Sequence, residues 1–369
     1  MIYSRTEKYI IDRVNKDLIK NLNTWKPSIN DIFYHQRYDY LNDGISIKKS
    51  IDLRHWIHLS KNISCKFVHE NCIETFDSTI ADEVKEIIET YKIDPSQFYF
   101  LLADENHCNF LKTELATRSI FGCNFEFYNA LLHRVELPQL PTTSEVTHKF
   151  SILSRNYNVW RLNLFLELQR QDLLTDCLYS FHNIKPYNEI NNVIDKDTIR
   201  QDAFGEITKP VNKWIKGIPY NLSPSDNVKN KYSDYSYDAI LRSNINILIE
   251  THFRPVTSKS YCAHITEKTY KNIICKKPFI VFSTSGWIKD FQKLGYRSFS
   301  PFIDERYDKI TDDYQRLLAI AAEVKRLNSL SKEDFLKLVN YCQEVVDYNY
   351  NLFLERKKHT WSNAFKFLN

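Results

Sequence analysis

The segments ITEKTYK at residues 265–271 and KPFIVF at residues 277–282 predict a loop, the start of a helix and then a buried strand. Thr266 is a suitable N-cap, because its hydroxyl can accept a hydrogen bond from a backbone N–H that has no partner within the helix. Glu267 and Lys268 would then lie in the first turn, where free N–H groups and the helix dipole favour an anionic ligand. An acid that can bind ribose hydroxyls, beside a base that can bind a diphosphate, suits a ligand that carries both groups.

Strands and helices are predicted to alternate on both sides of these segments. An apolar strand at residues 245–249 ends in Glu250, and a long polar stretch at 183–236 precedes it. Such alternation indicates a parallel sheet covered by helices, which is the α/β class. The other elements predicted in this half are a strand that begins at Lys149 and opens into a polar turn at 154–156, a helix at 159–168, strands at 177–181 and 278–283, and helices at 267–275, 286–294, 313–328, 333–350 and 352–367.

Strands and helices are also predicted to alternate in the first part of the chain. Ser4 and Glu7 form a capping box, which predicts a helix that continues to about residue 22. Prolines and threonines at residues 137–143 break the periodicity and predict a linker. The remaining elements predicted before this linker are a strand near 65–68, an amphipathic helix at 80–91, a strand at 98–102 and a further element near 121–132.

The pattern of Glu250, Thr266, Glu267, Lys268 and the strand at 278–282 resembles the donor-binding signature of α1,3-fucosyltransferases and related GT-B glycosyltransferases. The runs at 291–299 and 302–308 look like those of uncharacterised glycosyltransferases in phages and large viruses, and the resemblance covers roughly residues 148–320. One departure argues against fucose as the transferred sugar. The family pattern has Asn after the strand Glu, whereas Thr251 and His252 follow Glu250 here.

The resemblance implies a GT-B fold, with two Rossmann-like domains that face a central cleft and C-terminal helices that cross back to the first domain. We therefore expect an acceptor-binding α/β domain at residues 1–145 and a donor-binding Rossmann-like domain at 146–350. Residues 350–369 are expected to pack on the first domain. The implied activity is transfer of a hexosyl or pentosyl group from a UDP- or GDP-sugar to a hydroxyl. The transfer is expected to invert the configuration at the anomeric carbon and to require no cofactor or metal.

Three groups of polar residues follow predicted strands of the second domain, and ligands of doubly wound sheets bind at the carboxyl ends of strands. Arg155 would hold a phosphate through its fork of donors. Lys268 would neutralise the leaving diphosphate, and Glu267 would accept from the ribose hydroxyls. Glu250 either contacts the donor or orients Lys268, and Thr266 caps the helix. Weaker phosphate candidates, interpreted first as surface charges, are Lys271, Arg254, Arg161 and Arg297.

The acceptor hydroxyl needs a base that takes its proton, and we expect this base in the first domain. Asp104 and Glu105 follow the strand at 98–102 and are the preferred candidates. Their rivals are Glu126, His133 and the loop with Asp39 and Asp43.

Other acidic clusters are interpreted differently. The single Asp-x-Asp motif, Asp195 to Asp197, follows a poor strand, so no metal site is predicted there. The acidic residues 304–308, expected to follow a short strand, either face the nucleotide or cap the next helix, and the structural role is preferred.

Composition is that of a globular protein, with 43% hydrophobic and 26% charged residues. The eight cysteines lack metal-binding spacing and indicate a reducing compartment. The N-terminus does not resemble a signal peptide, and no run of 18 apolar residues occurs. A cytoplasmic protein without a membrane span is expected, in the host cytoplasm if the chain is viral. Residues 1–150 carry a net charge of −3 and residues 151–369 a net charge of +7, which places the basic half with the expected diphosphate site.

The acceptor stays open between two kinds of molecule. A basic stretch at 48–66, interleaved with His55, Trp56 and His58, suits DNA with an extruded base, such as a hydroxymethylpyrimidine. A surface glycan or a lipid-linked sugar is the alternative. The chain lacks Gly-x-Gly-x-x-Gly, phosphate-loop and Gly-x-Ser-x-Gly motifs, which argues against kinase and hydrolase chemistry. A non-catalytic GT-B module and a structural viral protein are the hypotheses from other classes.

Overall fold

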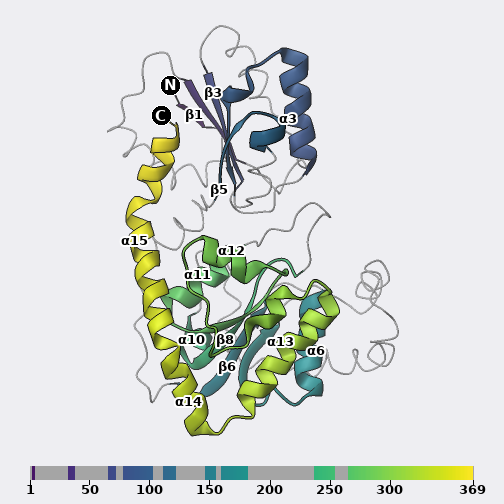
Figure 1. Ribbon diagram of the computed structural model, residues 1–369, viewed down its shortest axis with the longest axis vertical. Helices are drawn as coiled ribbons and strands as arrows, with labels where there is room; N and C mark the ends of the chain where they lie inside the picture. The colour runs from purple at the N-terminus through teal and green to yellow at the C-terminus, as the bar shows by residue number, and fades with distance from the viewer. Residues whose placement is uncertain are drawn as a thin grey trace. The chain divides into compact units, whose positions relative to one another are not determined.

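The computed structural model describes residues 2–4, 32–37, 65–71, 78–102, 111–121, 146–154, 159–181, 237–253 and 265–368 (Figure 1). The chain divides into two compact units, and each is described by itself. The first unit holds strands β1 to β5, helix α3 and residues 355–368, and the second holds the remaining described elements. The helix predicted after Ser4, the linker at 137–143 and the polar stretch at 183–236 lie outside the described residues.

The first unit contains a parallel sheet whose described strands follow one another in chain order. The predicted strands at 65–68 and 98–102 are confirmed, and the predicted helix is α3, in which Val84 and Ile87 are buried. A Rossmann sheet reverses its strand order at one point, and these five strands show no such reversal. The elements of this unit are β1 (Ile2–Ser4), β2 (Ile32–Arg37), β3 (Cys65–Asn71), α3 (Ser78–Tyr91), the 3₁₀ turn η2 (Pro95–Gln97), β4 (Phe98–Leu102) and β5 (Arg118–Phe121).

The second unit contains a four-stranded parallel sheet in the order β7-β6-β8-β9. Its strands are β6 (His148–Ser154), β7 (Cys177–Phe181), β8 (Ser243–Ile249) and β9 (Phe279–Phe282). All four residues of β9 and six of the seven in β8 are buried, as expected for strands covered on both faces. The chain runs from β6 to β7 in one direction and from β8 to β9 in the other, so the strand order reverses between β6 and β8.

The reversal places helices on both faces of this sheet. Crossovers between parallel strands are right-handed, so α6 (Val159–Arg170) and α11 (Glu267–Ile274) must cover opposite faces. Figure 1 shows α6 beside α13 (Asp313–Asn328) on one face, with α10 (Asp238–Leu241) and α11 toward the other. The other helical elements are α12 (Trp287–Lys293), the 3₁₀ helix η5 (Glu305–Lys309), α14 (Lys332–Tyr341) and α15 (Gln343–Leu368).

Helix α11 is fixed on its outer side by α15. The rings of Tyr270 and Phe353 stack with their centroids 5.6 Å apart, and both side chains are buried. At the end of α11, Lys276 Nζ is 2.9 Å from Asp347 Oδ1 and lies 4.6 Å from the ring centroid of Tyr350. The position of α11 on the sheet is therefore determined by apolar packing as well as by the polar contacts at its start.

We expect Phe335→Ala to lower the free energy of unfolding by about 3–5 kcal/mol, because it empties a core position. Phe335 is 1% exposed and its ring lies 5.7 Å from that of Phe150 on β6. The neighbouring Leu336 is 39% exposed, so Leu336→Ala should cost less than about 1 kcal/mol. Urea unfolding of both variants would measure the difference, and equal losses would contradict the packing of α14 described here.

Candidate functional site

The carboxyl ends of β6 and β8 meet at the reversal of strand order in the second sheet. In open α/β sheets this topological switch point is where ligands bind, because the connections diverge to opposite faces there. Glu250 directly follows β8, Thr266 precedes α11, and Arg161 lies in the first turn of α6. The site described below consists of these residues and their immediate neighbours.

Glu250 joins the end of β8 to the start of α11. Its carboxyl is 1% exposed and accepts hydrogen bonds from Thr266 N at 3.1 Å, from Thr266 Oγ1 at 2.5 Å and from Thr269 Oγ1 at 2.5 Å. Burial raises the pKa of Glu250, although Lys268 and these three hydrogen bonds act in the opposite direction. Both carboxyl oxygens are thus engaged with the first turn of α11.

Three oxygen atoms hold the ammonium group of Lys268 in place. Its Nζ donates to Thr251 Oγ1 at 3.2 Å and to Thr266 Oγ1 at 3.1 Å, and lies 3.3 Å from Glu267 Oε1. The side chain is 29% exposed, so Lys268 is oriented by these contacts while part of its side chain remains accessible to solvent. Burial raises the pKa of Glu267, but the charges of Lys268 and Lys271 outweigh it and leave this pKa below its ordinary value.

Thr266 is the N-cap of α11, as the sequence predicted, since its hydroxyl accepts from Lys268 N at 3.3 Å. The next amide, Thr269 N, donates to Thr266 O at 3.1 Å, and the carboxylate of Glu267 accepts from its own N–H. The free N–H groups expected at this helix start therefore already have partners. The positive charge at this helix start is therefore that of the side-chain cations Lys268 and Lys271.

Arg161 brings a second cation to the same place. Its side chain is buried, Nη2 donates to Glu250 O at 3.1 Å, and burial lowers its pKa while Glu250 and Glu267 act in the opposite direction. The sequence ranked Arg161 among weaker candidates. The signal in the sequence was its position. Arg161 lies in the first turn of α6, which follows β6, and Lys268 lies in the first turn of α11, which follows β8.

His252 is close enough to both cations for their charges to lower its pKa, and it is neutral at pH 7. Burial, Lys268 and Arg161 together lower its pKa to about 4. Its backbone oxygen accepts from Ser283 Oγ at 3.2 Å, which links the ends of β8 and β9. The site thus combines two fixed cations, two carboxyl groups and an uncharged imidazole at one edge of the sheet.

Several predicted residues fall elsewhere or outside the description. Arg297 is a paired surface charge, with Nη1 3.2 Å from Glu344 Oε1 and its guanidinium 3.9 Å from the ring centroid of Tyr348. Lys271 contributes to the electrostatics of Glu267. The predicted residues outside the described part of the chain are Asp39, Asp43, Asp104, Glu105, Glu126, His133, Arg155, Asp195, Asp197 and Arg254.

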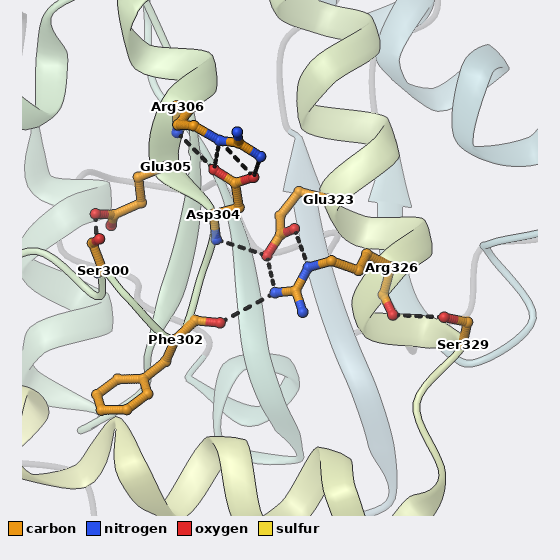
Figure 2. A network of polar contacts seen from close by, with 8 residues as sticks. All are labelled: Ser300, Phe302, Asp304, Glu305, Arg306, Glu323, Arg326 and Ser329. Atoms are coloured by element: carbon orange, nitrogen blue, oxygen red, sulfur yellow. Dashed lines mark hydrogen bonds and ion pairs between the residues drawn. The ribbon is translucent and has the colours of Figure 1, made fainter.

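The acidic residues 304–308 have structural roles, which Figure 2 shows for Asp304 and Glu305. Asp304 caps η5 and pairs with Arg306, while Glu305 accepts from Phe299 N at 2.9 Å and Ser300 N at 3.1 Å. Asp308 accepts from Ile288 N at the start of α12, and burial raises its pKa to about 6.

Two details differ from the sequence prediction for this region. The expected short strand before residue 304 is absent, because residues 300–302 form a turn that ends at η5. Helix α13 is capped by Asp312, whose carboxylate accepts from Gln315 N at 2.8 Å, and not by the acidic turn. Figure 2 shows the turn connected to α13 instead through Glu323, which accepts from Asp304 N at 2.9 Å and pairs with Arg326.

Within the described residues, no group of three His, Cys, Asp or Glu side chains could hold a metal ion. None of the helices in the described part of the chain is both long and apolar enough to span a membrane.

Comparison with known proteins gives little similarity. No protein-family model matches the chain, and no curated protein matches it at a significant level. A solved structure with a similar arrangement is the α,α-trehalose 6-phosphate synthase of Burkholderia multivorans, with a TM-score of 0.43 and 10% sequence identity. The match covers 98% of this chain and 75% of that protein.

The lowered pKa of His252 predicts a specific loss of stability in acid. Unfolded His252 binds a proton near pH 6.5 and folded His252 near pH 4, so its contribution is complete above pH 6.5 and is lost as the pH falls toward about 4. Between pH 7 and pH 4.5, the wild type should lose about 1–3 kcal/mol more than His252→Asn. Urea unfolding across this range measures the difference. Parallel curves for the two proteins would show that His252 is not buried as described.

Proposed function

We propose that the chain is a glycosyltransferase of the GT-B type that takes its sugar from a UDP- or GDP-sugar. The observation that carries this proposal is the gathering of Arg161, Glu267 and Lys268 at the switch point of a parallel sheet. Cations that converge from two helices onto this edge suit a diphosphate. The sequence pattern from Glu250 to the strand at 278–282 gives independent support through its resemblance to donor-binding signatures.

The donor residues are assigned by their chemistry. Lys268 and Arg161 neutralise the diphosphate as the glycosidic bond breaks, which stabilises the transition state without a metal ion. Arg155 adds a forked contact to a phosphate. Glu267 accepts from the ribose hydroxyls, while Glu250 and Thr266 hold the start of α11 in position.

The proposed reaction inverts the anomeric centre. The oxygen of the acceptor hydroxyl forms the new bond to the anomeric carbon, and the nucleoside diphosphate leaves with the electron pair of the old bond. Asp104 or Glu105 takes the proton of the acceptor hydroxyl. The proposed acceptor is a hydroxymethylpyrimidine in DNA, with a surface glycan or lipid-linked sugar as the alternative in the same enzyme class.

Lys268→Ala should weaken binding of UDP or GDP about 10- to 100-fold, because it removes a charge-assisted contact. Titration calorimetry on the full chain, with and without EDTA, measures this change. Lys325→Ala is the matched control, since Lys325 is exposed on α13, and it should bind as the wild type does. Equal affinity of Lys268→Ala and wild type would remove Lys268 from the donor site, and loss of binding in EDTA would contradict metal independence.

Transfer assays test the acceptor and the catalytic base. We expect sugar transfer to hydroxymethylated DNA and a rate at least about 100-fold lower for Asp104→Asn or Glu105→Gln, with unchanged donor affinity. Transfer to oligosaccharides alone would favour the glycan alternative. Tight donor binding without transfer to any acceptor would favour a non-catalytic module. Wild-type rates in both variants would exclude these two carboxylates as the base.

A further inference from the structure

Arg316, in the first turn of α13, is one of the most buried charged residues that the structure describes, with 1% exposure. Its Nε donates to Ser283 O at 3.0 Å, its Nη1 to Ile310 O at 2.9 Å, and its Nη2 to Phe253 O. Nη2 also lies 2.5 Å from Asp313 Oδ1. Every nitrogen of the guanidinium thus has an oxygen partner, which removes the large cost of burying it unpaired.

Two of the acceptors of Arg316 lie at the carboxyl ends of neighbouring strands. Phe253 follows β8 and Ser283 follows β9, so one side chain fixes the backbone after both strands. Ser283 Oγ makes a second connection between them by donating to His252 O at 3.2 Å. These bonds are made to backbone carbonyls, so they fix the path of the chain.

The ring of Phe253 is fixed as well. The guanidinium carbon of Arg316 lies 4.3 Å from the centroid of this ring. The ring of Phe253 also stacks on the ring of Phe282, with their centroids 3.9 Å apart and an interplanar angle of 9°. Trp160, the neighbour of Arg161, lies 5.3 Å from the same ring. The segment 251–253 is therefore held through its backbone and through its aromatic side chain.

This segment supplies two groups of the candidate site. Thr251 Oγ1 accepts from Lys268 Nζ at 3.2 Å, and His252 lies close enough to Lys268 and Arg161 for their charges to affect it. A change in the path of residues 251–253 would release one oxygen that orients Lys268. It would also admit water to the imidazole.

We propose that Arg316 is a positioning residue for the candidate site, which acts by clamping the segment 251–253 against the end of β9 and so orienting Lys268. It does not touch the ligand. Its planar fork of donors is required, because a lysine at this position has one nitrogen and cannot reach carbonyls in three segments at once. The effect on donor binding rests on the proposed function, whereas the clamp itself does not.

Arg316→Lys tests the clamp, with the titration of His252 as the direct measurement. Selective labelling of the 11 histidines and comparison with His252→Asn would assign the His252 signal in NMR spectra. In the wild type this signal should not titrate between pH 8 and about 5, in keeping with its pKa of about 4. In Arg316→Lys we expect a midpoint above about 5.5, because the imidazole becomes hydrated.

Affinity for UDP or GDP gives the second measurement. Arg316→Lys should weaken binding about tenfold through loss of the orientation of Lys268. Leu317→Ala is the matched control, since Leu317 is the next residue on α13 and is 0% exposed. It should lower Tm by about 5–15 °C and leave both the His252 titration and the affinity unchanged.

Phe253→Leu provides a second variant if Arg316→Lys does not fold. It removes the ring beneath the guanidinium and keeps the carbonyl acceptor, so the His252 midpoint should rise by a smaller amount. A His252 midpoint that stays at its wild-type value in a folded Arg316→Lys or Phe253→Leu variant would overturn the proposal, and so would an equal change in Leu317→Ala. If the wild type binds no nucleoside diphosphate, the proposed function fails, while the His252 titration still decides the clamp.

Discussion

The carboxyl group of Glu250 is the contact on which the rest of the site depends. It accepts from one amide and two hydroxyls of the first turn of α11, and it does so in a place closed to water. Removing the Thr266 hydroxyl takes its hydrogen bond from Oε2 of this buried carboxyl group, and such a loss is far costlier than losing an exposed hydrogen bond. The end of β8 and the start of α11 are therefore held together, and Lys268 takes its position from that junction.

The same region shows how fixed charge is accommodated at a sheet edge. Arg161 and Lys268 come from helices on opposite faces of the sheet, and acids and backbone oxygens surround them. His252, whose pKa both cations lower, stays neutral and so adds no further repulsion. Charges of both signs are thus gathered at this edge of the sheet, two cations from Arg161 and Lys268 beside the carboxyl groups of Glu250 and Glu267.

Local features of the sequence predicted the elements well, but contacts between residues far apart in the chain could not be predicted from the sequence. The strands at 98–102 and 177–181 and the helix at 313–328 have the predicted bounds, because periodicity and caps are written in neighbouring residues. Glu250 was predicted as a candidate site residue, but the groups that donate to it lie 16 to 19 residues further along the chain. Arg161 looked like a surface charge because its burial depends on how α6 packs, and the importance of Arg316 follows from carbonyls that no motif marks.

Helix α15 limits how the chain can be divided into fragments that each contain one whole unit. Helix α15 is one continuous run of 26 residues, yet its residues 343–354 belong to the second unit and 355–368 to the first. The first unit is thus assembled from three separate stretches of the chain, residues 1–133, 255–264 and 355–369. A single cut cannot release either unit whole, and a fragment that stops before residue 355 would leave the first unit without a structural part.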